Sequence, residues 1–182
     1  MISNEEKALC LSIVRESIAY ELGLQKSIPA HPNSPIFDEK FGLFVTLHQN
    51  TRLRGCIGYV EPFKDLYSSL LDLSRAAAFR DTRFQPVQKH EFESLHIEIS
   101  ILSPLYLVQD IGEIIIGRDG LLVKHPFSSG LLLPQVATEQ NWDRETFLSQ
   151  TLRKANLPDH FVKDKDLLIY RFEAIIFGES RL

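Results

Sequence analysis

Residues 53–58, with the sequence LRGCIG, form the segment whose residue types are best suited to carry out chemistry. The pattern is that of a β-strand, in which alternate side chains share a face, so Arg54 and Cys56 are expected to point the same way. A nearby guanidinium stabilises a thiolate and lowers the pKa of the cysteine, which makes the cysteine reactive. Gly55 and Gly58 would let backbone N–H groups approach a ligand, or let the strand bulge. The segment predicts a site in which Cys56 is a nucleophile or thiol carrier, and Arg54 activates it or binds an anionic group.

A second interpretation of the same residues is a non-catalytic binding module. A free cysteine is commonly a small buried hydrophobic residue, and a glycine within a strand commonly marks a bulge. The cluster would then be a pocket or docking surface for a small molecule or a protein. The two interpretations differ in the reactivity of Cys56, which we predict to exceed that of Cys10. The latter lies among leucines in a helical pattern, where burial raises the pKa of a thiol.

Glu98 is the carboxylate expected to orient Arg54, because it lies on the polar face of its own predicted strand. It shares that face with His96, and these two residues are the best candidates for a general base. The other histidines are scattered along the chain and form no group that suggests catalysis. Glu98 is therefore predicted to belong to the ligand-binding site around Cys56.

Two further motifs contribute candidate ligand-binding residues. Asp81 and Arg83 follow a predicted helix, where they could pair and shape a turn, although a solvated structural ion pair fits the same pattern. Gln135 follows Pro134 at the predicted start of another helix, whose free N–H groups can hold an anion. We expect Gln135 to lie near Cys56 despite the long stretch of chain between them. The alternative for Gln135 is a capping or packing role.

The sequence disfavours several large classes of protein. It contains no G-x-G-x-x-G dinucleotide motif, no Walker-type phosphate loop and no G-x-S-x-G nucleophile elbow. No C-x-x-C or H-x-x-x-H pair indicates a metal site, so neither a metal nor a cofactor is expected. The 20 basic and 24 acidic residues give a net charge of −4 without a basic stripe, so nucleic-acid binding is not expected.

The sequence is typical of a cytoplasmic protein. Its N-terminal residues are polar and lead into an amphipathic segment, unlike those of a signal peptide. No apolar stretch approaches the roughly 20 residues that are needed to cross a membrane. The two cysteines have different surroundings, which fits two free thiols in a reducing compartment.

Hydrophobic periodicity, together with turn and cap residues, predicts the elements that would position the site. They are a helix starting at Ser3 or Asn4 and ending at Gly23, a hairpin of strands 41–48 and 52–58, a helix at 64–80, a strand at 95–102, a hairpin of strands 113–117 and 120–124, helices after Pro134 and Asp143, and a strand at 167–177. Hairpins and alternating faces predict an α+β fold with antiparallel β-sheet and flanking α-helices. No linker divides residues 1–182, so a single domain is expected.

Five motifs, in their order along the chain, resemble the AMMECR domain family, also called AmmeMemoRadiSam system protein A. They are LRGCIG at 53–58, Asp81-x-Arg83-Phe84, IEISILSP at 97–104, LLLPQV at 131–136 and Trp142-Asp143. The resemblance extends over nearly the whole chain. It implies a two-lobed α and β fold with antiparallel sheet, which agrees with the fold class predicted from the residues.

The resemblance also implies a role in a modification pathway. Prokaryotic members of the family are partners, by gene association or fusion, of a radical S-adenosylmethionine enzyme and a Memo-like protein. Cys56 and Arg54 would then be the centre of a site for an unknown small-molecule ligand. Relatives often carry a second cysteine at the position held here by Leu152. Its absence favours a mechanism with one thiol over a mechanism with two, because nothing in the sequence makes Cys10 a substitute.

Overall fold

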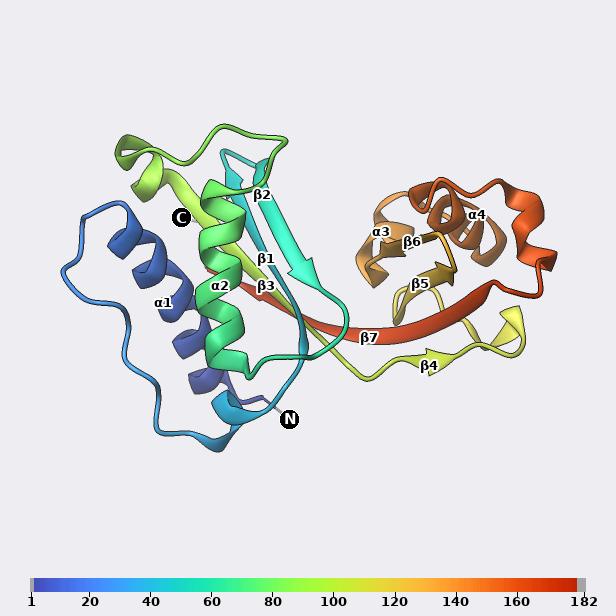
Figure 1. Cartoon of the computed structure of the whole chain (residues 1–182), viewed down its shortest axis with the longest axis horizontal. Coiled ribbons are helices and arrows are strands. Elements are labelled where there is room, and N and C mark those ends of the chain that lie inside the picture. The colour runs from blue at the N-terminus through green and yellow to red at the C-terminus, as the bar shows by residue number, and fades with distance from the viewer. Residues whose placement is uncertain (1, 180–182) are drawn as a thin grey trace. The chain divides into compact units, whose positions relative to one another are not determined.

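The chain forms two compact units (Figure 1). The computed structural model describes residues 2–179. Unit 1 comprises Met1–Ile101 and Ile175–Leu182, and unit 2 comprises Leu102–Ala174. The α-helices are α1 (Asn4–Glu21), α2 (Leu66–Phe79), α3 (Pro134–Glu139) and α4 (Arg144–Lys154). None of the helices in the described part of the chain has the length and apolar character that a membrane span needs.

The strands follow the order β2-β1-β3-β7-β5-β6, and β4 pairs with β7. Their bounds are β1 (Gly42–Gln49), β2 (Arg52–Tyr59), β3 (Leu95–Leu102), β4 (Tyr106–Leu107), β5 (Asp119–His125), β6 (Ser128–Leu132) and β7 (Leu168–Gly178). The β1–β2, β4–β7, β5–β6 and β5–β7 pairs are antiparallel. The predicted α+β class with antiparallel sheet and flanking helices is confirmed.

Side-chain caps begin both long helices of unit 1, at Ser3, where the sequence predicts a cap, and at Asp65, which the sequence analysis placed inside the helix predicted at 64–80. The Ser3 hydroxyl accepts a hydrogen bond from the N–H of Glu6, and the Glu6 carboxylate accepts one from the N–H of Ser3. Such a capping box satisfies two donors that the first turn of a helix leaves unpaired. Asp65 caps α2 by accepting from the N–H of Ser68 at 2.8 Å. The end of α2 leads directly into the loop that carries Asp81.

The predicted hairpin of β1 and β2 is confirmed, and it contains a β-bulge. Asn50 and Thr51 at its tip have φ values of 48° and 68°, because two-residue hairpin turns of this kind need left-handed backbone at both positions. The register shifts once, between Leu47 and His48, which leaves Arg54 as an extra residue on β2. A bulge interrupts the alternation of side chains between the two faces of a strand. Strand alternation therefore no longer predicts whether the side chains of Arg54 and Cys56 share a face, and the position of the Arg54 side chain must be taken from its contacts.

The core of unit 1 lies between its helices and one face of the sheet. α1 and α2 lie side by side (Figure 1) and pack against apolar residues of β1 and β3. The fully buried strand residues of this core are Leu43, Val45, Leu47, Ile97 and Ile99. Side chains alternate along a strand, so Thr46 and Glu98 lie on the opposite face. The one-sided packing of the helices thus leaves polar side chains together on the other face of the sheet.

In unit 2, α3 and α4 pack around a core that includes Phe147 and Leu152. α3 begins at Pro134 and α4 is capped by Asp143, whose carboxylate accepts from the N–H of Thr146 at 2.8 Å. Both helix starts were predicted from the sequence. Leu152 is 1% exposed in this core.

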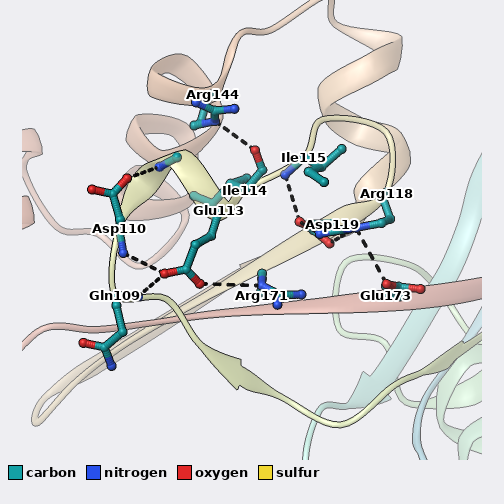
Figure 2. A network of polar contacts seen from close by, with 11 residues as sticks. Gln109, Asp110, Glu113, Ile114, Ile115, Arg118, Asp119, Arg144, Arg171 and Glu173 are labelled. Carbon is teal, nitrogen blue, oxygen red and sulfur yellow. Dashed lines mark hydrogen bonds and ion pairs between the residues drawn. The ribbon is translucent and has the colours of Figure 1, made fainter.

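The predicted hairpin of strands 113–117 and 120–124 is wrong, because the hairpin partner of β5 is β6. The segment before β5 instead folds around the buried carboxylate of Asp119 (Figure 2). This carboxylate accepts from the N–H of Ile115 and from two nitrogens of Arg118, each at 2.8 Å. Gly117 has a φ of 87°, a left-handed conformation that ends any strand there. The Gly-Arg-Asp sequence is therefore a turn around a buried acid rather than the tip of a hairpin.

The same network fixes the segment before β5 to the rest of unit 2. Arg144 at the start of α4 donates from Nε to the carbonyl of Ile114 at 2.8 Å, and Glu113 lies 4.0 Å from Nε of Arg171 on β7 (Figure 2). These contacts replace the strand ladder that periodicity predicted for this segment.

Candidate functional site

Cys56 lies on β2, which ends the strand order, so no described strand pairs with its outer edge. Two side chains from the loop after α2 bind that edge instead. The N–H of Cys56 donates to Oδ2 of Asp81 at 2.9 Å, and its carbonyl accepts from Nη2 of Arg83 at 3.1 Å. The main chain of Cys56 is therefore held at both its donor and its acceptor. Asp81 and Arg83, which were predicted as ligand-binding residues, are brought together with the cysteine.

Asp81 and Arg83 form a bidentate ion pair. Nε of Arg83 donates to Oδ1 of Asp81 at 2.9 Å, and Nη2 donates to Oδ2 at 2.6 Å. These hydrogen bonds from Arg83 hold the pKa of Asp81 well below its usual range, against the effect of burial. The side chain of Asp81 is 4% exposed and that of Arg83 is 52% exposed. The pair thus presents a buried anion to the backbone of Cys56 and an accessible cation to solvent.

Thr46 on β1 is the cross-strand neighbour of Cys56. Both backbone groups of Cys56 point away from β1, so this is a pair without mutual backbone hydrogen bonds, the kind in which side chains approach most closely. The hydroxyl of Thr46 accordingly donates to Sγ of Cys56 at 3.2 Å. The sequence analysis missed Thr46. Counting back from the two-residue turn pairs Thr46 with Gly55, and only the bulge shifts its partner to Cys56, so no local signal in the sequence identifies it.

The expectation that Arg54 lowers the pKa of Cys56 is contradicted. Burial raises the pKa of the Cys56 thiol; the hydrogen bond from Thr46 and the positive charge of Arg83 act in the opposite direction but are outweighed. Cys56 is half-buried, and desolvation always disfavours the charged form of a group. The resting thiol is therefore protonated at neutral pH, and the cation that acts on it is Arg83.

The sequence analysis predicted Glu98 as the partner of Arg54, but Arg54 pairs with Glu91 instead. Its Nε and Nη2 donate to the two carboxylate oxygens of Glu91 at 2.8 and 3.0 Å, and its Nη1 donates to the carbonyl of Gln85 at 2.9 Å. The two charged side chains are only 13% and 12% exposed. The hydrogen bonds from Arg54 lower the pKa of Glu91. Arg54 thus ties the bulge of β2 to the short helix η2 (Lys89–Ser94), a contact over 37 positions that no local pattern indicates.

Glu98 lies close enough to Cys56 for its negative charge to raise the pKa of the thiol, although less than burial does. The structure therefore brings this predicted residue to the site, although not in the predicted role towards Arg54. Ser100 follows on the same face of β3, and its hydroxyl is buried without a hydrogen-bond partner among the described residues. This face of β3 thus carries a carboxylate that acts on Cys56 and a hydroxyl without a hydrogen-bond partner among the described residues.

Gly55 and Gly58 both lie where another part of unit 1 comes very close. A Cβ added to Gly55 would lie 2.1 Å from the carbonyl oxygen of Ala77 in α2, and one added to Gly58 would lie 2.3 Å from the ring of Phe44. The absence of a side chain is thus required for packing at both positions. The suggested contact of their backbone with a ligand stays a prediction.

Gln135 lies in the first turn of α3, and its Oε1 is buried without a hydrogen-bond partner in the described part of the chain. It belongs to unit 2 and Cys56 to unit 1, so their predicted proximity stays a prediction. Cys10 is fully buried, and burial raises the pKa of its thiol to about 12, in agreement with the expected inert core residue. Among residues 2–179, no group of three or more histidine, cysteine or acidic side chains is placed to hold a metal ion.

Known proteins similar to this chain cover it almost completely. The model of the AMMECR1 family matches residues 11–177. A protein from Methanothermobacter thermautotrophicus is 40% identical over 186 residues, which cover 98% of this chain and 97% of the relative. Protein MJ0810 from Methanocaldococcus jannaschii is 39% identical over 188 residues, with 98% and 92% covered. The crystal structure of the uncharacterized protein PH0010 from Pyrococcus horikoshii superposes with a TM-score of 0.90 at 37% identity, covering 98% of this chain and 94% of that one.

Proposed function

Because the chain belongs to the AMMECR1 family, we propose that it acts in a modification pathway, with Cys56 at the centre of its substrate site. The partners in this pathway are a radical S-adenosylmethionine enzyme and a Memo-like protein, as the resemblance of the motifs implies. Cys56 is the nucleophile or thiol carrier. The observation that carries the proposal is the immobilisation of Cys56 by two backbone hydrogen bonds and one hydrogen bond to its sulfur.

These contacts exceed what a structural cysteine needs. A buried thiol packs as a small hydrophobic residue without polar partners. The exposed edge of a terminal strand can be protected by a lysine, a proline or a bulge alone. Burying the carboxylate of Asp81 carries a desolvation penalty that only good geometry with Arg83 offsets. These contacts therefore support a function in which the sulfur of Cys56 must be held in a fixed position.

The chemistry requires the protonated thiol to lose its proton when a substrate binds. Thr46 and Arg83 stabilise the thiolate once it forms, by a hydrogen bond and by charge. Glu98 is the carboxylate near the thiol that can receive the proton through a water molecule. An anionic group of the substrate would bind the exposed guanidinium of Arg83, because planar N–H donors suit carboxylate and phosphate groups. Arg54 supports the strand through Glu91.

The test is the pH dependence of alkylation by iodoacetamide in the Cys10→Ala protein, in which Cys56 is the only thiol. We expect one titration with a midpoint above that of a free thiol, about 8.5. Arg83→Gln should move the midpoint to higher pH, whereas Arg83→Lys should largely retain it. If Cys56 reacts only after urea unfolds the protein, the proposal that Cys56 is a nucleophile is refuted.

The raised pKa of Cys56 favours one second candidate, the non-catalytic binding module. A neutral thiol is a weak nucleophile but an adequate small lining group for a pocket or docking surface. Complementation of cells that lack the gene separates the two functions. Cys56→Ser should abolish complementation if the sulfur reacts, and should retain it if the site only binds.

We also propose a cytoplasmic location, which is supported by two cysteines that are both free thiols.

The partner proposal is tested by affinity capture of the tagged chain from extracts of its own host, followed by mass spectrometry. Recovery of a radical S-adenosylmethionine enzyme or a Memo-like protein supports it. Loss of that recovery in Arg83→Gln, in protein that circular dichroism shows to be folded, would place the contact at the Cys56 site.

A further inference from the structure

Unit 1 contains an apolar pocket of about 320 Å³ at the N-terminal end of α1. The short helix η1 (Pro35–Asp38) forms one side of it, and the ends of β3 and β7 form another. Its apolar lining consists of Ile2, Pro35, Ile36, Phe41, Ile101 and Ile175. This volume is near the lower limit of small-molecule sites, about 300–1,000 Å³. The pocket therefore suits a ligand with a single ring or a short hydrocarbon chain.

Glu6 supplies a fixed carboxylate to the pocket. One of its oxygens accepts from the N–H of Ser3 and the other from the hydroxyl of Ser34, each at 2.7 Å. The backbone hydrogen bond from Ser3, followed by that of Ser34, lowers the pKa of Glu6, so the group stays ionised at neutral pH. Each oxygen still has a lone pair for a further donor.

Glu39 supplies a second carboxylate from the loop that follows η1. Its backbone is fixed, because its N–H donates to the carbonyl of Ile36 at 3.1 Å and its carbonyl accepts from the N–H of Leu66 at 2.7 Å. Its side chain is exposed and can turn towards a ligand. None of the nine lining residues, all within the described part of the chain, is basic. The pocket thus combines an apolar wall with negative charge.

We propose that this pocket binds a small primary amine that carries an apolar ring or short chain. Burial of the apolar part removes hydrocarbon surface from water, and the ammonium group donates charge-assisted hydrogen bonds to Glu6 and Glu39. The ring of Phe41 offers a second favourable surface for a cation. A carboxylate ligand of the same shape is repelled by both acids. The site is separate from Cys56, and its existence does not depend on the proposed function.

The test uses three probes of nearly equal shape: 2-phenylethylamine, the neutral 2-phenylethanol and the anionic phenylacetate. Binding is followed in the full chain by the methyl NMR signals of isoleucine, because Ile2, Ile36, Ile101 and Ile175 line the pocket. We expect the amine to shift these signals at the lowest concentration, the alcohol at higher concentration and the acid not at all. Equal affinity for amine and alcohol, or the absence of shifts at these four residues, would overturn the proposal.

Variants test whether the carboxylate of Glu39 binds the ammonium group of the ligand. Glu39→Gln keeps the shape of the side chain and should weaken the amine about tenfold while leaving the alcohol unchanged, since one charge-assisted hydrogen bond corresponds to roughly that factor. Glu93→Gln is the matched control, because Glu93 is also exposed in unit 1 but lies outside the pocket. Equal weakening by both variants would contradict a local carboxylate contact. Ile175→Trp, at an exposed lining position, should fill the pocket and exclude amine and alcohol alike.

Discussion

Gly55→Ala should destabilise the protein strongly, although it adds only one methyl group. The new Cβ would lie 2.1 Å from the carbonyl oxygen of Ala77 and 3.1 Å from its carbonyl carbon. A carbon and a carbonyl oxygen normally stay about 3.3 Å or more apart, so α2 must move away from β2 by about 1 Å. The opposing atoms belong to helix backbone, which has no rotamer to change. We therefore expect a loss near the upper end of overpacking effects, about 3 kcal/mol.

The assay is thermal unfolding followed by circular dichroism and calorimetry. A loss of about 3 kcal/mol corresponds to a decrease in Tm of about 6–12 °C for a chain of this size. The control is Gly112→Ala, where the nearest atom to the added Cβ is Oδ1 of Asp110 at 2.7 Å, which belongs to a side chain and can shift at the expense of its hydrogen bond from the N–H of Gly112. That variant should lose less than about 1 kcal/mol. If Gly55→Ala were as stable as the control, the close packing of α2 on β2 would be refuted.

Three further predictions concern the polar contacts around the site. Glu91→Gln leaves the guanidinium of Arg54, which is 13% exposed, partly unpaired. Urea unfolding should therefore show a free energy of unfolding lower by about 2–3 kcal/mol, and an unchanged midpoint would show that the ion pair does not stabilise the fold. Asp81 has a lowered pKa in the folded state, so its contribution to stability is full above the unfolded value of about 3.9 and is lost as the pH falls further. Asp81→Asn should therefore flatten the acid limb of the stability profile, and an equally steep limb would contradict this. Thr46→Val removes the donor to Sγ of Cys56, so the alkylation midpoint should rise, and a lower midpoint would argue against that hydrogen bond.

Local signals in the sequence were sufficient for the elements that carry the site. Ser3 and Asp143 are helix caps because their side chains bond donors only three residues ahead, and such contacts depend on no other part of the fold. The two residues between β1 and β2 define a hairpin for the same reason. The candidate residues Asp81, Arg83 and Glu98 were also found from the sequence, as polar positions next to or within predicted elements. Their roles were not.

Contacts between distant residues decided the roles. Local alternation related Arg54 to Cys56, but a bulge opposite Leu47 removed that relation, and the ion pair with Glu91 required η2 to lie beside the hairpin. The turn at Gly117 looked like a hairpin tip because the sequence does not show that the Asp119 carboxylate is buried there.

The sequence by itself determined the helix caps, the antiparallel hairpin of β1 and β2, and the place of Cys56 on a strand beside glycines. These depend on interactions between residues close together in the chain, which a pattern of residue types can encode. Only the tertiary structure decided which cation acts on the thiol and in which direction its pKa moves. That outcome is a balance between burial, the hydrogen bond from Thr46 and the charges of Arg83, Asp81 and Glu98. Burial is set by everything packed around the sulfur, so no spacing along the chain can reveal it.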